Sequence, residues 1–180
     1  MIRAFTLLLL LLCCGSLLLA DDSEDDRETV SPKESFKIVQ HRDGNWNEAL
    51  HFTNGKYPDI ILEKGISWPA LFYISPDDQW ILRVQKSGSG DNISFLYRIK
   101  PNGRLWGMDR SFSELALNFL KHSSGISRSD FYHTGIEFGD WNLATGILSF
   151  TIHGSSIKRS GEGFEEALIY DLKKDKFSAP

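Results

Sequence analysis

The pattern of hydrophobic and polar residues divides the chain into three parts. Residues 1–20 hold an apolar run rich in leucine, and residues 21–35 are mostly polar and acidic. From Phe36 onward, short segments that alternate apolar with polar residues are separated by turns containing glycine, asparagine or aspartate. Such alternation is typical of β-strands with one buried face, and such turns are typical of hairpins. The sequence therefore predicts a leader, a spacer and a single mainly β domain over residues 36–180.

Ten segments of this domain carry the strand pattern. The turns between them include Asn54-Gly55 and Asn102-Gly103, and an Asn-Gly pair between apolar runs is a strong signal for a hairpin. Consecutive strands joined by short turns pair antiparallel, so we expect an antiparallel meander or partial propeller-like sheets. The predicted strands are residues 36–39, 48–52, 59–62, 70–74, 80–84, 95–99, 105–106, 134–138, 147–152 and 167–172.

One segment, residues 112–121, departs from the strand pattern. Its apolar residues recur at intervals of three and four, which places them on one face of a helix. Ser111 or Ser113 is suited to cap the N-terminus of this helix, and Gly125 lies beyond its end. The sequence predicts one short helix here, and its apolar face would consist of Phe112, Leu115, Ala116, Phe119 and Leu120.

The first twenty residues have the three parts of a secretory signal peptide. Arg3 provides the positive start, the leucine-rich run provides the apolar core, and Ala20 is a small residue suited to a cleavage site. A helix that spans a bilayer needs about 20 apolar residues, and this run is shorter. Cleavage after Ala20 is therefore favoured over a retained anchor. The protein is predicted to be secreted or periplasmic, with no stable membrane span after cleavage.

Both cysteines, Cys13 and Cys14, lie inside this signal. The domain that follows has no disulfide, no thiolate nucleophile and no cysteine ligand for a metal, so burial of apolar surface must stabilise it. The composition supports this, since 41% of the residues are hydrophobic and 12% are aromatic. Export without cysteines favours a bacterial envelope over an animal extracellular space.

The charge is unevenly distributed. The formal net charge is −4, and six of the 24 acidic residues lie between Asp21 and Glu28. The rest of the chain after the signal is close to neutral, and nothing in it indicates the basic face that binds a phosphate backbone. No nucleic-acid partner is expected. Residues 21–35 are predicted to be a disordered, solvated spacer, with a calcium-binding tail as the alternative.

Three units of the domain, residues 36–65, 70–107 and 131–180, follow a similar order of strand, loop, strand and turn. Their first strands place Ile38 and Leu82 44 residues apart. The next interval is 66 residues, because the predicted helix lies within it. A faint internal repeat and an ordinary meander with hairpins at this rhythm both fit the pattern.

The middle unit contains the motif SPDD at residues 75–78, then a strand, a glycine-rich loop, a second strand and the motif PNG at residues 101–103. This order resembles a WD40-like β-propeller blade of the TolB type, although Asp78 stands where such blades prefer glycine. Closed propellers have at least four blades, and three at most fit here. The resemblance therefore implies an open sheet, a sandwich, or a partial propeller that another chain completes. Such blades serve as platforms whose loops bind other molecules, so the resemblance implies binding.

Signatures of common enzyme classes are missing from the sequence. The serines beside glycine do not form a G-x-S-x-G elbow, and no glycine-rich loop has the spacing for a dinucleotide or a nucleoside triphosphate. No cofactor is expected. The leading hypothesis is a secreted or periplasmic domain, not an enzyme, that binds an envelope protein or glycan. The alternative is a small envelope hydrolase that cleaves glycan or peptide with carboxylates or a histidine–aspartate metal site.

Tryptophans beside predicted turns are the first candidates for a binding surface. Trp46 and Trp141 neighbour polar residues in predicted loops, so they are expected to be exposed. Exposed aromatic side chains dominate binding hot spots. Trp80 and Trp106 adjoin apolar strands and are expected in the core.

Two loop carboxylates and one local cluster complete the set of candidates. Asp77 and Asp91 lie on predicted loops, where a carboxylate binds a ligand or stabilises the turn itself. His133, Glu137 and Asp140 form the most metal-like local set, without a recognised zinc spacing. The alternative for this set is a group of strand-end side chains with no ligand role.

Overall fold

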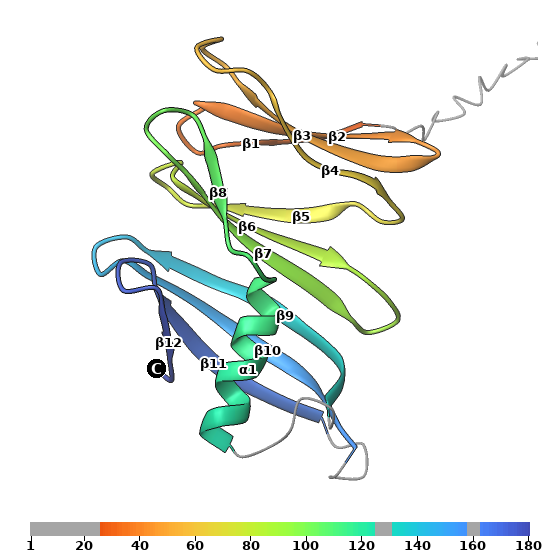
Figure 1. The fold of residues 1–180 in the computed structure, drawn as a ribbon, viewed down its shortest axis with the longest axis vertical. Coiled ribbons are helices and arrows are strands. Elements are labelled where there is room, and N and C mark those ends of the chain that lie inside the picture. The colour runs from red at the N-terminus through yellow and green to blue at the C-terminus, as the bar shows by residue number, and fades with distance from the viewer. Residues whose placement is uncertain (1–25, 125–130, 158–162) are drawn as a thin grey trace, which may run out of the picture.

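A computed structural model describes residues 26–124, 131–157 and 163–180. These residues form three antiparallel sheets of four strands each and one helix (Figure 1). In each sheet the strand order follows the chain, so the strands pair with their neighbours in sequence. The predicted class, mainly β with antiparallel sheets and one short helix, is confirmed. The predicted signal peptide, residues 1–20, and the start of the spacer lie outside the described residues.

Sheet A contains β1 (Asp26–Val30), β2 (Phe36–Asp43), β3 (Asn45–Phe52) and β4 (Ile60–Ile66). Buried and less buried residues alternate along β2 and β3, because one face of this sheet packs against sheet B. Gly44 joins the two strands with a φ of 70°, a conformation that glycine adopts without steric cost.

The prediction of a disordered spacer over residues 21–35 is wrong from Asp26 onward. Asp26 to Val30 form β1, which pairs with β2 along its whole length. Glu28 also forms an ion pair with Lys37 of β2 at 2.6 Å. Charged side chains are normal on an edge strand, so a low apolar content does not prevent pairing here.

Sheet B contains β5 (Ala70–Ile74), β6 (Trp80–Lys86), β7 (Asn92–Ile99) and β8 (Leu105–Gly107). It lies between the other two sheets (Figure 1). The first five residues of β6 are all buried, because alternate side chains of this strand enter the cores on the two faces of the sheet.

Sheet C contains β9 (Phe131–Asn142), β10 (Ile147–Ser156), β11 (Gly163–Asp171) and β12 (Lys176–Ser178). The first three strands are longer than predicted, and β12 is a short edge strand that the sequence pattern did not indicate. β9 contains two irregularities in its pairing with β10, so its side chains do not keep one simple alternation.

The helix α1 (Phe112–Ser124) connects sheet B to sheet C. It begins where predicted and ends three residues beyond the predicted range. The backbone N–H of Glu114 donates to Ser111 Oγ at 3.3 Å, so Ser111 is the N-terminal cap. The helix packs against β7 and β10, one strand from each of the two sheets (Figure 1).

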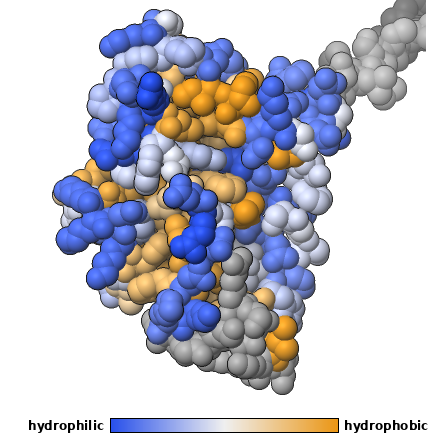
Figure 2. Space-filling view, viewed as in Figure 1, coloured by the Kyte–Doolittle hydropathy of each residue, from blue (hydrophilic) through white to orange (hydrophobic). Residues whose placement is uncertain are grey.

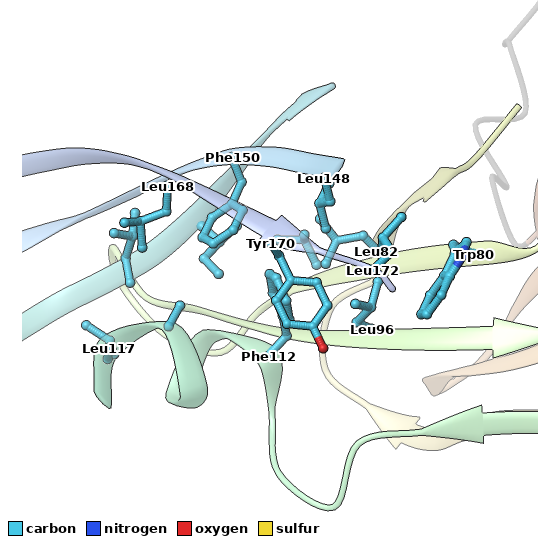
Figure 3. Close-up of a cluster of buried hydrophobic side chains, with 14 of the residues drawn as sticks. Trp80, Leu82, Leu96, Phe112, Leu117, Leu148, Phe150, Leu168, Tyr170 and Leu172 are labelled. Carbon is cyan, nitrogen blue, oxygen red and sulfur yellow. The ribbon is translucent and has the colours of Figure 1, made fainter. Parts of the chain in front are cut away.

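The larger core lies between sheet B, sheet C and α1 (Figure 3). Leu82 and Phe112 have no exposed surface in it. The ring of Phe112 lies 5.1 to 5.2 Å from the rings of Phe150, Tyr170 and Phe177, centroid to centroid. Aromatic and aliphatic side chains from one helix and two sheets therefore form a continuous apolar interior.

The core between sheets A and B is smaller and contains an ion pair. Arg83 Nε of β6 donates to Glu48 Oε2 of β3 at 2.6 Å, and the two side chains are 1% and 0% exposed. Gln40 donates to the other oxygen of Glu48 at 3.1 Å, and Gln85 accepts from Arg83 at 2.6 Å. The fully buried apolar residues of this core are Phe36, Ile38, Leu50 and Ile81.

The turns at residues 31–36 and 75–80 have the same hydrogen bonds. Each begins with Ser-Pro, and Ser31 and Ser75 are 44 residues apart, the interval found for the predicted units. In each turn the serine N–H donates to the carbonyl oxygen of the sixth residue, at 3.0 and 2.9 Å. The serine Oγ accepts from the N–H of that same residue, at 3.2 and 2.9 Å. The fourth residue has a positive φ in both turns, 56° and 62°.

Candidate binding groove

The first strand of each sheet is an edge strand, and β1, β5 and β9 together line one groove of about 370 Å³. This volume lies within the range of small-ligand sites, roughly 300–1,000 Å³. We call this feature the three-edge groove. Its main lining residues are Val30 of β1, Phe72, Tyr73 and Ile74 of β5, and Phe138, Asp140 and Trp141 of β9.

Among the described residues β5 is an edge strand, and Phe72, Tyr73 and Ile74 of this strand line the three-edge groove. Within the described part of the chain β5 pairs only with β6, and the N–H of Ser75 donates to Trp80 O at 2.9 Å. Hydrogen-bonded and non-hydrogen-bonded pairs alternate along an antiparallel ladder. Tyr73 is therefore a hydrogen-bonded position, whereas the N–H and C=O groups of Phe72 and Ile74 face away from β6. These groups form a free strand edge.

Aromatic side chains of β5 and β9 form one wall of the groove. Tyr73 stacks on Phe138 with their centroids 4.4 Å apart and an angle of 16° between the ring planes. The ring of Trp141 lies 5.8 Å from that of Phe138. These ring contacts join sheet B to sheet C and form an apolar surface at the groove.

The indole N–H of Trp141 is buried without a hydrogen-bond partner among the described residues. The side chain is 8% exposed and lines the groove. A buried donor without an acceptor costs roughly 1–3 kcal/mol. Because this nitrogen has almost no accessible surface, an occupant of the groove would meet the indole ring and not its N–H.

Asp140 supplies the charge of the groove. It is exposed, and it is the one lining residue that is charged at neutral pH. The groove therefore combines an apolar wall, a free strand edge and one carboxylate. This set favours an extended, mainly apolar segment that carries a positive charge.

The prediction that Trp46 and Trp141 are exposed is wrong. Trp46 is 5% exposed and lies beneath the guanidinium groups of Arg27 and Arg42, 5.1 and 5.9 Å from its ring. Both tryptophans adjoin turns, but they occupy inward-facing positions of β3 and β9. Trp141 contributes to the three-edge groove, and Trp46 does not.

The predicted burial of Trp80 and Trp106 is confirmed for only one of the two. Trp80 is 8% exposed, so its predicted place in the core is confirmed. Trp106 is 39% exposed, and its predicted burial is wrong. It lies on β8, a strand of three residues at the edge of sheet B, where no further strand of the described chain covers it.

The loop carboxylates are engaged within the protein. Asp77 accepts from Ser75 Oγ and from the N–H of Gln79, at 2.5 and 3.1 Å, and so closes its own turn. Asp91 accepts from the N–H of Thr134 at 2.7 Å, which ties sheet B to β9. Neither residue lines the three-edge groove.

Asp78, the departure from the blade motif, ties sheet B to sheet A. Its carboxylate accepts from the hydroxyls of Ser31 and Ser35, at 2.7 and 2.6 Å, and from the N–H of Lys33 at 3.1 Å. Its φ of 62° explains why glycine suits this position. Aspartate adopts this strained φ, and its carboxylate makes the hydrogen bonds to sheet A that a glycine could not make.

The predicted metal set is not assembled. Among residues 26–124, 131–157 and 163–180, no three His, Cys, Asp or Glu side chains gather where they could hold a metal ion. The three positions are spread along the single strand β9, which rises about 3.3 Å per residue. His133 packs so closely beside Gly90 that a Cβ added to this glycine would lie 3.2 Å from the His133 ring. Asp140 lines the three-edge groove, and Glu137 is exposed.

Comparison with known proteins finds no matching family model and no matching curated protein. The described residues contain no helix with the length and apolar character needed to cross a membrane.

Proposed function

We propose that this protein is an exported binding domain, not an enzyme, that captures an extended segment of an envelope protein in the three-edge groove. The observation that carries the proposal is the free edge of β5 inside an apolar groove. An extended peptide that adds a strand to an exposed sheet edge gains main-chain hydrogen bonds, and alternate side chains enter pockets. The N–H and C=O groups of Phe72 and Ile74 provide that edge.

Two side chains select the bound segment. Trp141 lines the groove with its indole, which provides an apolar contact for a side chain of the peptide. Asp140 attracts a lysine or arginine of the peptide. The blade resemblance and the predicted signal peptide support the same proposal, since they favour a platform that works outside the cytoplasm.

The test uses an acetylated hexapeptide that alternates valine with threonine and carries one central lysine. We expect saturable binding to the full chain by isothermal titration calorimetry. Two N-methylated forms of the peptide provide matched controls, each with methyl groups on one alternate set of amides. One form loses binding, because its methyl groups face β5, and the other retains it.

The protein variant for this test is Asp140→Asn, which keeps the size of an exposed side chain. It should lower affinity for the lysine peptide by about two- to fivefold, since an exposed ion pair contributes roughly 0.2–1 kcal/mol. Affinity for the same peptide with glutamine in place of lysine should not change. Equal loss with both N-methylated peptides, or no binding at all, would contradict the proposal.

A further inference from the structure

A second hollow lies at the opposite edges of sheets B and C. It is lined by β8, by the segment that leads into α1, by α1 itself and by the end of sheet C, and its volume is about 390 Å³. Figure 1 shows the chain running from β8 into α1, and Figure 2 shows, in the same view, hydrophobic areas bordered by hydrophilic side chains. We call this hollow the β8–β12 cleft. It shares no lining residue with the three-edge groove.

The interior of the β8–β12 cleft is aromatic and rigid. Tyr170 and Phe177 line it with their ring centroids 4.8 Å apart. Phe177 also contacts Phe112 at 5.2 Å and Phe119 at 6.0 Å, so its ring is part of the main core. A ligand would meet a preformed apolar surface and would not have to order it.

An exposed indole completes the apolar part. Trp106 lines the cleft and is 39% exposed. Lys100 Nζ lies 5.3 Å from the centroid of the Trp106 ring, so the lysine covers one of the two faces of the indole. Aromatic side chains of this kind are frequent anchors of bound ligands because they bury a large area with few rotatable bonds.

The polar groups of the cleft include both acceptors and a donor. Asp109 and Asp175 supply carboxylates, and Arg110 supplies a guanidinium group. The hydroxyl of Tyr170 hydrogen-bonds Asp175 and so fixes the position of that carboxylate. Two carboxylates disfavour an anion, and Arg110 disfavours a simple cation. Neighbouring acceptors and a donor beside an aromatic surface instead match a ring that carries hydroxyl groups on its rim and C–H groups on its face.

We propose that the β8–β12 cleft binds a neutral pyranose unit of a saccharide. The C–H face of the sugar stacks on Trp106, and its hydroxyls donate to Asp109 and Asp175 and accept from Arg110. This site and its ligand are separate from the peptide segment proposed for the three-edge groove. The protein would then hold a saccharide at one edge of its sheets and a protein segment at the other.

The experiment measures binding of three probes, cellobiose, maltose and chitobiose, to the full chain by saturation-transfer NMR. At least one should show transfer from protein to the ring C–H protons. Trp106→Ala should weaken that binding by about tenfold, the loss that corresponds to about 1.4 kcal/mol at a hot spot. Asp109→Asn should weaken it severalfold without changing thermal stability, because this side chain is exposed.

Trp68→Ala is the matched control. Trp68 is also exposed, by 43%, and also carries a lysine over its ring, Lys86 at 5.5 Å, but it does not line the cleft. This variant should bind the sugar as the unchanged protein does. Retention on cellulose, starch or chitin then distinguishes an internal unit of a polymer from a free disaccharide. Equal losses with Trp68→Ala and Trp106→Ala, or no transfer to any of the three disaccharides, would overturn the proposal.

Discussion

The two faces of sheet B meet their neighbours through different chemistry. Toward sheet C and α1, the interface is a large aromatic and aliphatic core. Toward sheet A, the apolar core is smaller and surrounds the ion pair of Arg83 with Glu48, which has almost no exposed surface. Nη1 of Arg83 is also buried without a hydrogen-bond partner among the described residues.

The interface with sheet C mainly stabilises the fold, whereas the ion pair at the interface with sheet A mainly specifies how sheets A and B are arranged. Apolar burial stabilises by roughly 25 cal/mol for each Å² removed from water, so the interface with sheet C supplies most of the favourable free energy. A buried ion pair contributes little net stability, because desolvation offsets its Coulomb attraction, but removing one partner is strongly unfavourable. The pair therefore penalises any arrangement of sheets A and B in which Arg83 and Glu48 do not meet.

Removing an aromatic ring from the larger core should destabilise the protein most. Phe112→Ala should lower the free energy of unfolding by about 4 kcal/mol, because a fully buried phenylalanine leaves a cavity among other rings. Urea denaturation followed by tryptophan fluorescence measures this. Phe95→Ala is the control, a half-buried ring that lies 5.7 Å from Arg83 on the other face of sheet B. Its loss should be clearly smaller, and equal losses would contradict the comparison.

The contribution of the ion pair to stability can be measured by replacing first one and then both of its residues. Arg83→Met should lower the free energy of unfolding by about 3 kcal/mol, because Glu48 stays buried without its partner. The double variant Arg83→Met with Glu48→Leu should recover most of this loss in the same urea titration. If the double variant stays as unstable as Arg83→Met alone, replacing the pair by apolar residues costs stability, and the pair itself contributes a large net share of it.

The third prediction concerns the tie between the turns of sheets A and B. Asp78→Gly should lower the free energy of unfolding by about 1–2 kcal/mol, since four donors lose their acceptor while the backbone strain is relieved. Glu34→Gly is the matched control, because Glu34 has the same positive φ in the equivalent turn and is exposed. It should be neutral or slightly stabilising. A loss of equal size in both variants would mean that the turns, and not the tie, respond to the change.

The smallest effect is a pH dependence confined to the interface with sheet A. Burial raises the pKa of the Tyr97 phenol above its usual value; the charge of Arg83 opposes this shift, and Glu48 and Glu63 add to it. The unfolded chain loses this proton near pH 10, before the folded chain does, so stability falls as the pH rises above about 10. Tyr97→Phe should remove that part of the slope in urea titrations between pH 9 and 11. An unchanged slope would show that other groups cause it.

Most of the fold could be predicted because most strands have one buried face. The segment that became β2 is an example, because buried residues alternate with less buried ones from Phe36 to Gln40. β1 and β12 could not be predicted this way, since each holds a single apolar residue and forms by pairing with a neighbouring strand. A signal for β1 was available in Ser31-Pro32, which repeats Ser75-Pro76 at the interval of 44 residues.

The candidate sites were less accessible to sequence analysis. The three-edge groove joins residues of β1, β5 and β9, which become neighbours only when the sheets stack. Trp141 and Asp140 were named as candidates for separate reasons, and the fold brings both to this groove. Exposure of Trp46 and Trp106 was assigned from neighbouring residues, whereas it depends on which face of the strand each occupies and on whether another strand covers it.

The pairing of Glu48 with Arg83 also sets an order for folding during synthesis. Every ladder among the residues that the structure describes joins neighbouring strands, so hairpins of each sheet close small loops and form early. Glu48, however, leaves the ribosome 35 residues before Arg83. Until β6 arrives, the carboxylate of Glu48 must stay hydrated, and the inner face of sheet A cannot close around it. The first sheet to be made therefore completes its core only when the second is present.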